Sequence, residues 1–169
     1  MKLSLCITTF NRPELTIKSF EKVYDDPRID EIIISDDASE YNNSLQLERY
    51  LVQLPHPTQH PKILYNRNMD NIGMSRNKHH VISLARNEWC ILLDSDNVID
   101  SSYIDAWFKL FPIGPKGEAH PFKNCIYCPS GALPNFDYTK YAGQKICPID
   151  VRVERNDQTF NCLLNTCNF

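Results

Sequence analysis

Residues 88–96, EWCILLDSD, join an apolar run to two carboxylates, Asp94 and Asp96. The apolar run predicts a buried β-strand, and unpaired carboxylates are costly to bury, more so when two lie side by side. In an extended segment alternate side chains face the same way, so we expect both aspartates to project to one side. Either the pair is solvated as ordinary turn chemistry, or a positive group belongs beside it.

The same unit, an apolar strand with polar residues at its end and a helix after it, recurs along the chain. The predicted strands are residues 3–8, 30–37, 62–66 and 88–96. The predicted helices are residues 11–24, 44–54, 75–87 and 101–111. Continuous apolar strands that alternate with helices predict an α/β protein with a mainly parallel sheet covered on both faces. Ligands of such sheets bind at the carboxyl ends of the strands.

Composition places the chain among ordinary globular proteins, with 169 residues, 42% of them hydrophobic and 23% charged. This length fits one domain that can bury a hydrophobic core. The net charge is −3 and no long basic run occurs, which argues against a nucleic-acid partner. No apolar stretch approaches the roughly 18 residues of a membrane span, and the first residues lack the features of a signal peptide. We therefore expect a cytoplasmic protein without a transmembrane segment, in contact with a membrane only through a partner.

Seven cysteines, an odd number, predict reduced thiols in the core rather than a disulfide framework, with Cys6 and Cys90 inside predicted strands. A zinc site is the alternative for four later cysteines, which are Cys125, Cys128, Cys162 and Cys167. The first two of these lie three positions apart in a predicted strand, where their side chains would face opposite ways. This spacing favours core cysteines over zinc ligands.

Polar clusters follow the first, second and fourth predicted strands: TTFNR at 8–12, DDAS at 36–39 and DSDN at 94–97. Asp36 and Asp37 alternate sides, so at most one can face a site while the other caps the turn or faces solvent. A divalent Mg²⁺ or Mn²⁺ ion, with a diphosphate as a further ligand, would relieve the repulsion between Asp94 and Asp96. The alternative is that both are solvated turn residues.

The segment NIGMSRNKHH, residues 71–80, precedes the fourth strand. Gly73 allows a tight turn, and Ser75 is expected to cap the helix that follows. Arg76 and Lys78 would place cations beside the helix amino terminus, which predicts an anion site. The alternative is an exposed, mildly basic first turn.

Four segments stand out together and in order: CITTFNRPE (6–14), EIIISDDASE (31–40), NIGMSRNKHHVISLARNEWCILLDSDN (71–97) and LLNTCNF (163–169). They resemble inverting glycosyltransferase family 2, which has the Rossmann-like GT-A fold. The resemblance implies a nucleotide-sugar donor, with a UDP-sugar favoured as the commoner choice in the family, and a carbohydrate or other hydroxyl acceptor. It also implies Mn²⁺ or Mg²⁺ as cofactor and a single displacement with inversion.

The resemblance further implies roles for individual residues. Asp37 would bind the base, Asp94 would approach the ribose or the metal, and Asp96 would be the main metal ligand. The family usually carries an arginine after the glycine and serine of this segment. Counted by length, Lys78 occupies that position here, and Arg76 is the nearest arginine. Which of the two contacts the donor stays open. The residues expected to bind the nucleotide are Thr8, Thr9, Phe10, Asn11, Arg12, Asp37, Arg76, Lys78, Asp94 and Ser95.

The resemblance does not identify a catalytic base, because in this family it normally lies beyond the segment that matches NTCNF, where the sequence ends. Asp150, Glu154 and Asp157 are the available substitutes. We expect residues 1–111 to form the nucleotide-sugar-binding half and residues 112–169 a partial acceptor-side segment with irregular strands. The chain is expected to belong to a longer protein or to an oligomer.

Two alternatives to a transferase stay open. A nucleotide-binding or interaction module without a complete catalytic site would use the same residues. The segment DSDNV, residues 94–98, also fits a haloacid-dehalogenase-like phosphatase with Asp94 as nucleophile and Asp96 as acid/base. That motif normally opens its chain and needs a lysine and further acidic residues downstream, and its late position here favours the transferase.

Overall fold

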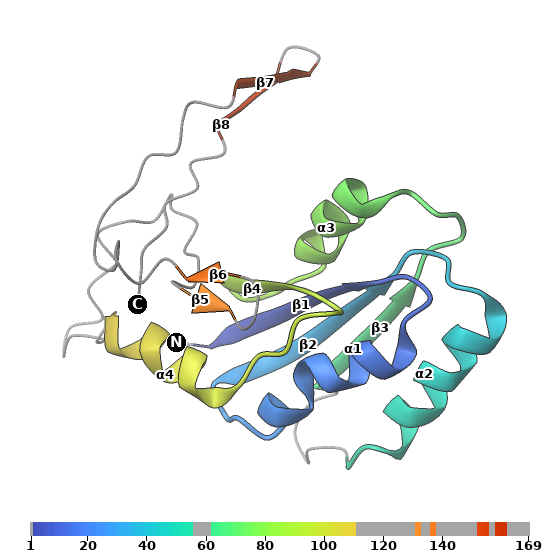
Figure 1. Cartoon of the computed structure of the whole chain (residues 1–169), viewed down its shortest axis with the longest axis horizontal. Helices are drawn as coiled ribbons and strands as arrows, with labels where there is room; N and C mark the ends of the chain where they lie inside the picture. Colours follow the sequence, from blue (N-terminus) through green and yellow to red (C-terminus); the bar gives the residue numbers. More distant parts are fainter. Residues whose placement is uncertain are drawn as a thin grey trace. The chain divides into compact units, whose positions relative to one another are not determined.

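The computed structural model describes residues 2–55 and 62–110, together with short strands at 131–132, 136–137, 152–155 and 158–161. The chain divides into two compact units, Met1–Ser101 and Ser102–Phe169, and each is considered by itself. Figure 1 shows the elements of both units. The predicted functional division of the chain after residue 111 stays a prediction.

The described part of the first unit contains a four-stranded parallel sheet in the order β3-β2-β1-β4 (Figure 1). Its strands are β1 (Leu3–Thr9), β2 (Ile29–Asp36), β3 (Ile63–Arg67) and β4 (Trp89–Asp94). All seven residues of β1 are buried, as the continuous apolar run predicts for a central parallel strand. The predicted α/β class and parallel sheet are therefore confirmed.

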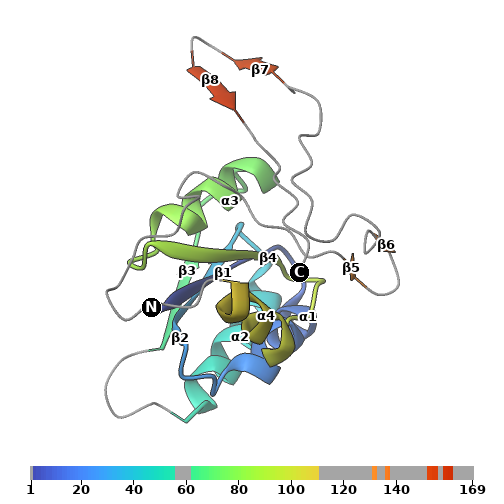
Figure 2. The same ribbon diagram turned by 90° about the vertical axis from the view of Figure 1, so that its left-hand side faces the viewer.

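Helices cover both faces of this sheet. They are α1 (Pro13–Phe20), continued by the 3₁₀ turn η1 (Glu21–Val23), then α2 (Tyr41–Gln53) and α3 (Met74–Ser83). Helices α1 and α2 pack together on one face, and α3 lies against β1, β2 and β4 on the other (Figures 1 and 2). The chain moves outward from β1 to β3, and α3 then carries it back across the sheet to β4. This reversal leaves a crevice beyond the carboxyl ends of β1 and β4.

The core on the α3 face explains why that helix docks there. Cys6 of β1, Ile33 of β2 and Val81 of α3 are fully buried together, with the half-buried Leu84 and Cys90 against them. Burial of such side chains stabilises the fold by about 1.5–3 kcal/mol each. Cys6 and Cys90 are free thiols, as predicted. The four later cysteines lie outside the described residues.

The helix starts differ from those predicted. Pro13 occupies the first turn of α1, where its missing N–H costs no hydrogen bond. Helix α2 begins at Tyr41 rather than at Ser44 as predicted. Ser44 lies inside the helix, and its hydroxyl donates to the buried Asp36. The prediction that Ser75 caps α3 is wrong: Gly73 is the N-cap, in a positive-φ conformation of 84°, and the exposed Ser75 lies in the first turn.

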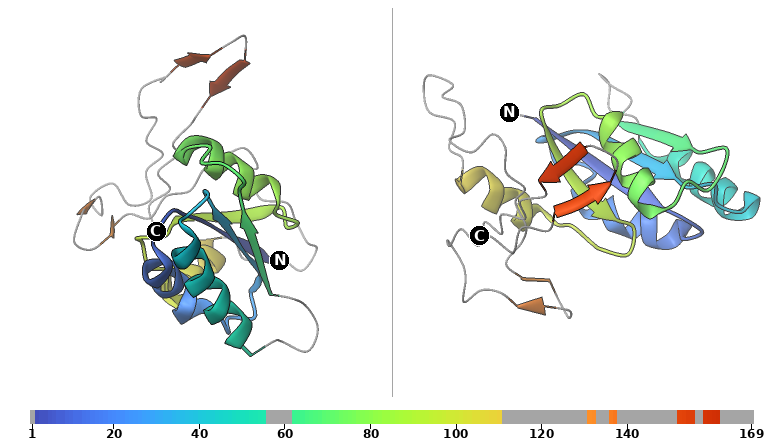
Figure 3. Two further views of the ribbon diagram at one scale, coloured as in Figure 1. Left: turned by 90° about the vertical axis from the view of Figure 1, so that its right-hand side faces the viewer. Right: turned by 90° about the horizontal axis from the view of Figure 1, so that it is seen from above.

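The second unit begins within α4 (Ser101–Leu110), which matches the predicted helix. The expected β segment follows as two short antiparallel pairs, visible as opposed arrows in Figure 3. These pairs are β5 (Gly131–Ala132) with β6 (Phe136–Asp137), and β7 (Arg152–Arg155) with β8 (Gln158–Asn161). Among the described residues, no helix has the length and apolar character that crossing a membrane requires.

Candidate functional site

A pocket of about 350 Å³ lies at the carboxyl edge of the sheet, within the first unit. Its walls come from the ends of β1 and β4, the turn after β2 and the start of α3. The lining residues that the sequence predicted are Thr8, Thr9, Phe10, Arg12, Asp37, Asp94, Ser95 and Asp96. Residues that are far apart in the chain therefore meet here, as expected for ligand sites of parallel sheets.

Asp94 is the last residue of β4, and a neighbouring strand and helix both contact its carboxylate. The Thr8 hydroxyl donates to Oδ1 at 3.2 Å. The Lys78 ammonium group of α3 lies 2.8 Å from Oδ1 and 2.9 Å from Oδ2. Lys78, predicted as one of two possible donor contacts, does not itself line the pocket but contacts Asp94, which does.

Asp96 lies in the turn after β4, and Arg12 balances its charge. The strand ends at Asp94 rather than at residue 96 as predicted, because the Asn97 N–H donates to the Asp94 carbonyl and closes a turn there. The Arg12 guanidinium lies 2.8 Å from Asp96 Oδ2. The two aspartates nevertheless line the same pocket, and the positive groups beside them are side chains of the chain itself.

Asp36 and Asp37 divide their roles in the predicted way. Asp36 is buried and caps the turn, accepting hydrogen bonds from the backbone and hydroxyl groups of Ser39 and from the Ser44 hydroxyl. The Tyr65 hydroxyl also donates to Asp36, at 2.7 Å. Burial and this contact raise the pKa of Tyr65 above its ordinary value, so the phenol stays protonated as a donor.

Asp37 faces the pocket and holds the segment that precedes α3. Its Oδ1 accepts the Ile72 N–H at 2.8 Å and the Asn68 amide at 3.0 Å. Its Oδ2 accepts the Gly73 N–H at 2.9 Å. The Asp37 N–H in turn donates to the Thr9 carbonyl at 2.9 Å, which ties the turn to β1. Asp37 is therefore an anchor for one wall of the pocket.

Three lining residues, Asn71, Met74 and Asn77, were not predicted. Asn77 is buried, donates to the Ser35 carbonyl at 2.9 Å and accepts from the Ser35 hydroxyl at 2.6 Å. A signal for it exists in the sequence, because Asn77 lies four positions before the apolar Val81 and shares its helix face. A polar residue on an apolar helix face marks a buried hydrogen-bonding position.

Other predicted site residues lie away from the pocket. Asn11 adopts a positive φ of 56°, and its side chain accepts from the Glu40 N–H and from the Asn43 amide, which ties the turn after β1 to the start of α2. Arg76 is exposed, and among the described residues no hydrogen bond or ion pair reaches it. Asp150 and Asp157 lie outside the described residues.

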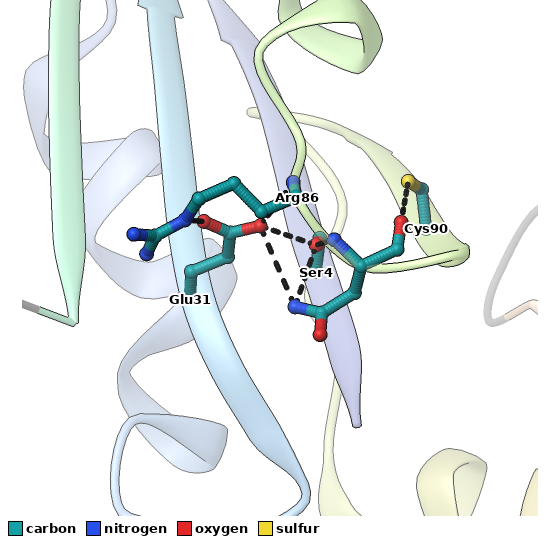
Figure 4. Close-up of polar contacts among 5 residues, drawn as sticks. Ser4, Glu31, Arg86 and Cys90 are labelled. Atoms are coloured by element: carbon teal, nitrogen blue, oxygen red, sulfur yellow. Dashed lines mark hydrogen bonds and ion pairs between the residues drawn. The ribbon is translucent and has the colours of Figure 1, made fainter. Parts of the chain in front are cut away.

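A second polar cluster lies near the opposite ends of the strands (Figure 4). Buried Glu31 of β2 accepts from the Ser4 hydroxyl at 2.6 Å and from Arg86 N–H and Nε at 2.7 and 2.8 Å. Burial acts to raise the pKa of Glu31, but the hydrogen bonds from Ser4 and Arg86 outweigh it and lower that pKa below its ordinary value. Its polar groups satisfy one another, so this cluster is structural.

The sequence pattern of Glycosyl transferase family 2 matches residues 4–113, which contain every lining residue of the pocket. The chain belongs to this family. A Campylobacter jejuni relative, GalNAc(5)-diNAcBac-PP-undecaprenol beta-1,3-glucosyltransferase, is 30% identical over 133 residues, covering 78% of this chain and 40% of that protein. Salmonella typhimurium abequosyltransferase RfbV is 29% identical over 102 residues, covering 59% of this chain and 29% of that protein.

Solved structures agree on the fold. The crystal structure of S. aureus TarS 1-349 matches with a TM-score of 0.51 and 20% identity, over 65% of this chain and 33% of that one. The GT-A type of α/β fold predicted from the sequence is therefore confirmed for this member of the family. The chain spans 40% or less of the length of these curated relatives.

The family resemblance implies a divalent metal ion. The pocket residues fit an ion that binds together with a phosphate-containing substrate. No group of three or more His, Cys, Asp or Glu side chains gathers for a metal among the described residues. Asp94 and Asp96 are 40% and 51% exposed, so both can reach an ion in the pocket. Mg²⁺ is commonly held by one or two carboxylates plus substrate phosphates and water. Asp94 and Asp96 can supply two such carboxylates, whereas the Asp37 carboxylate is already engaged by Asn68, Ile72 and Gly73.

Proposed function

We propose that this chain binds a nucleotide sugar in the pocket and transfers the glycosyl group to an acceptor hydroxyl, with inversion at the anomeric carbon. One observation supports this above others: a single pocket gathers Asp94 and Asp96, each beside a cation, at the ligand-binding edge of the sheet. The family relatives are named as glucosyl- and abequosyltransferases, so glycosyl transfer is the chemistry that they share.

The charged side chains suit a diphosphate leaving group. Arg12 and Lys78 would stabilise the negative charge that develops on it through charge-assisted hydrogen bonds to its phosphate oxygens. Asp94 and Asp96 would hold a Mg²⁺ or Mn²⁺ ion, which supplies further positive charge to the diphosphate. Phe10 offers an exposed aromatic face to the base beside Asp37.

The acceptor side of the reaction extends beyond these residues. An acceptor hydroxyl needs a general base to remove its proton as it attacks the anomeric carbon. Asp150 and Asp157 stay the proposed candidates within this chain. The acceptor is a carbohydrate or another hydroxyl compound, and the remainder of a longer protein or an oligomeric partner would complete its site.

Nucleotide binding tests the proposal most directly. Isothermal titration of the chain with UDP, GDP and dTDP, each with and without Mn²⁺, should show metal-dependent binding to at least one, with UDP the first expectation. Asp96→Ala should abolish that dependence. Asp70→Ala removes an exposed carboxylate outside the pocket and should leave binding unchanged. Absence of binding to every nucleotide would contradict the proposal.

Turnover separates a transferase from a binding module that uses the same pocket. Release of the nucleoside diphosphate from its sugar donor, with the product anomer identified by NMR, would support inverting transfer. Binding without turnover would favour the module. The family membership gives no support to the phosphatase alternative. Activity on a simple phosphoester would revive it, provided that Asp94→Asn abolishes that activity.

A further inference from the structure

Asp94 and Asp96, two of the three carboxylates that line the pocket, each have a cation from a different element beside them. Arg12, in the turn between β1 and α1, contacts Asp96 at 2.8 Å. Lys78, on α3, contacts both oxygens of Asp94. Arg12 and Lys78 therefore balance the formal charges of Asp96 and Asp94, whereas the third lining carboxylate, Asp37, accepts hydrogen bonds from Asn68, Ile72 and Gly73.

These two ion pairs are open to solvent. The side chains of Arg12 and Asp96 are 52% and 51% exposed, and those of Lys78 and Asp94 are 29% and 40% exposed. Ion pairs of this kind contribute at most about five-fold to an equilibrium constant. Both cations also sit on long, flexible side chains, which can change partner without a change in the backbone.

The pairing places the cations in competition with a divalent metal. A metal ion alone would have to displace the Lys78 ammonium from both oxygens of Asp94 and the Arg12 guanidinium from Asp96. It would then lie beside two cations that have lost their anions. A nucleotide diphosphate removes this difficulty, because its phosphates supply the anions that the displaced cations require.

We propose that Arg12 and Lys78 are exchangeable counterions of Asp96 and Asp94, which makes the metal and the nucleotide diphosphate bind cooperatively. The inference rests on the proposed function and deepens it. Arg12 and Lys78 pass from the carboxylates to the phosphates, and the carboxylates become free for the metal. Coupling between two ligands is reciprocal. The nucleotide therefore raises the affinity for the metal by the same factor by which the metal raises the affinity for the nucleotide.

The buried ion pair of the sheet gives a contrast. Glu31 is 3% exposed, so departure of the Arg86 side chain would leave a buried charge without its counterion, held only by the hydrogen bonds from Ser4 and the Arg86 backbone. Arg12 and Lys78 face no such penalty, because water reaches the carboxylates that they would leave. Exchange is therefore confined to the pocket.

Binding of Mn²⁺ measured by the electron paramagnetic resonance signal of the free ion tests this in the full chain. Wild type should bind Mn²⁺ weakly in the absence of nucleotide. Saturating UDP or GDP should raise its affinity for Mn²⁺ by about ten-fold or more. Arg12→Gln and Lys78→Gln should each raise the affinity for Mn²⁺ in the absence of nucleotide by about two- to five-fold. Each should also weaken nucleotide binding in the presence of Mn²⁺, so the coupling factor falls. Asp96→Asn should lose the Mn²⁺ site.

Arg49→Gln and Lys18→Gln are matched controls, because they remove one exposed charge each from α2 and α1 outside the pocket. They should leave both affinities as in wild type. If wild type binds both ligands but Mn²⁺ equally well with and without nucleotide, the counterion exchange is wrong and the donor site stands. The same conclusion follows if the pocket variants bind Mn²⁺ alone no better than wild type. If no nucleotide binds wild type, the proposed function itself fails, and the exchange fails with it.

Discussion

Glu31 shows how one residue can be buried and charged together. Removal from water favours the neutral acid, but the Ser4 hydroxyl and the Arg86 backbone and side chain all donate to the ionised form. The hydrogen bonds prevail, and the pKa of Glu31 lies below its ordinary value of 4.5. The carboxylate therefore stabilises the fold fully above about pH 4.5, and this contribution is lost as the pH falls through the lower folded pKa.

Replacement of Glu31 should expose this dependence. Glu31→Gln should lower the free energy of unfolding by about 1.5–3 kcal/mol at pH 7, the range for hydrogen bonds to charged groups. The difference from wild type should narrow as the pH falls below about 4.5, because wild type loses the ionised carboxylate there. Urea denaturation at pH 7 and toward pH 3 measures both effects.

Glu48→Gln is the control for this experiment, since Glu48 is an exposed carboxylate on α2. Its effect should stay small at every pH. A Glu31→Gln penalty that is independent of pH would show that shape, and not charge, is what the cluster requires.

Asp37 carries a second prediction at this scale. An amide offers only one acceptor oxygen, so Asp37→Asn must lose the contact to Gly73 or the contacts to Ile72 and Asn68. Hydrogen exchange should therefore speed up at the Ile72 amide or at the Gly73 amide, and nucleotide affinity should fall. Asp70→Asn, an exposed change in the same loop, should alter neither. Unchanged exchange at both amides would show that Asp37 does not anchor this wall.

At the scale of elements, the start of α3 depends on one backbone conformation. Gly73 has φ 84° and ψ 154°, a region open in practice only to glycine. A methyl group at this position would meet no atom within 4 Å, so a substitution has only a backbone cost. The preceding loop and the first turn of the helix form one wall of the pocket, and this glycine links them.

Gly73→Ala should therefore destabilise the fold by about 1–3 kcal/mol without a steric clash. Ala38, which has φ 62° in the turn after β2, provides the opposite case. Ala38→Gly should change stability by no more than about 1 kcal/mol, because relief of the left-handed strain offsets the added chain entropy. Urea denaturation of the two variants tests the pair, and equal losses would refute the backbone explanation.

The strands were easier to predict than the helix ends. Strands β1 and β2 lie in the middle of the sheet, and their continuous apolar runs follow directly from burial on both faces. Helix starts depend on contacts that no local pattern contains. The predicted helix starts at Ser44, but that hydroxyl donates to Asp36, eight positions earlier, and the helix begins at Tyr41.

At the scale of the whole molecule, the predictable part of the site is the set of residues at strand ends. Topology brings Thr8, Asp37 and Asp94 together in any parallel sheet of this order. The partners of the carboxylates were not predictable, because Arg12 and Asp96 lie 84 positions apart and their pairing depends on how two turns meet. The sequence indicated that a positive group lies beside Asp94 and Asp96 if they are not simply solvated. It did not identify the side chains that supply the charge.

Ligands should stabilise the whole fold if the proposed function is correct. UDP with Mn²⁺ at about 100 times the dissociation constant should add about 2.7 kcal/mol to the free energy of unfolding. Thermal unfolding with and without the ligands measures this. Asp96→Ala, an exposed position, should unfold like wild type without ligands and gain nothing from them. A gain in that variant equal to wild type would place the ligands elsewhere.

The anchoring of one pocket wall through its backbone has a use in protein engineering. Asp37 accepts hydrogen bonds from the main chain before α3, whereas Phe10 and Met74 line the pocket with apolar side chains that are 45% and 68% exposed. A combinatorial library at these two positions would reshape the cavity while it leaves the anchor and the carboxylates intact. Under the proposed function, donor preference in this scaffold could thus be evolved separately from the residues that we propose to bind the diphosphate.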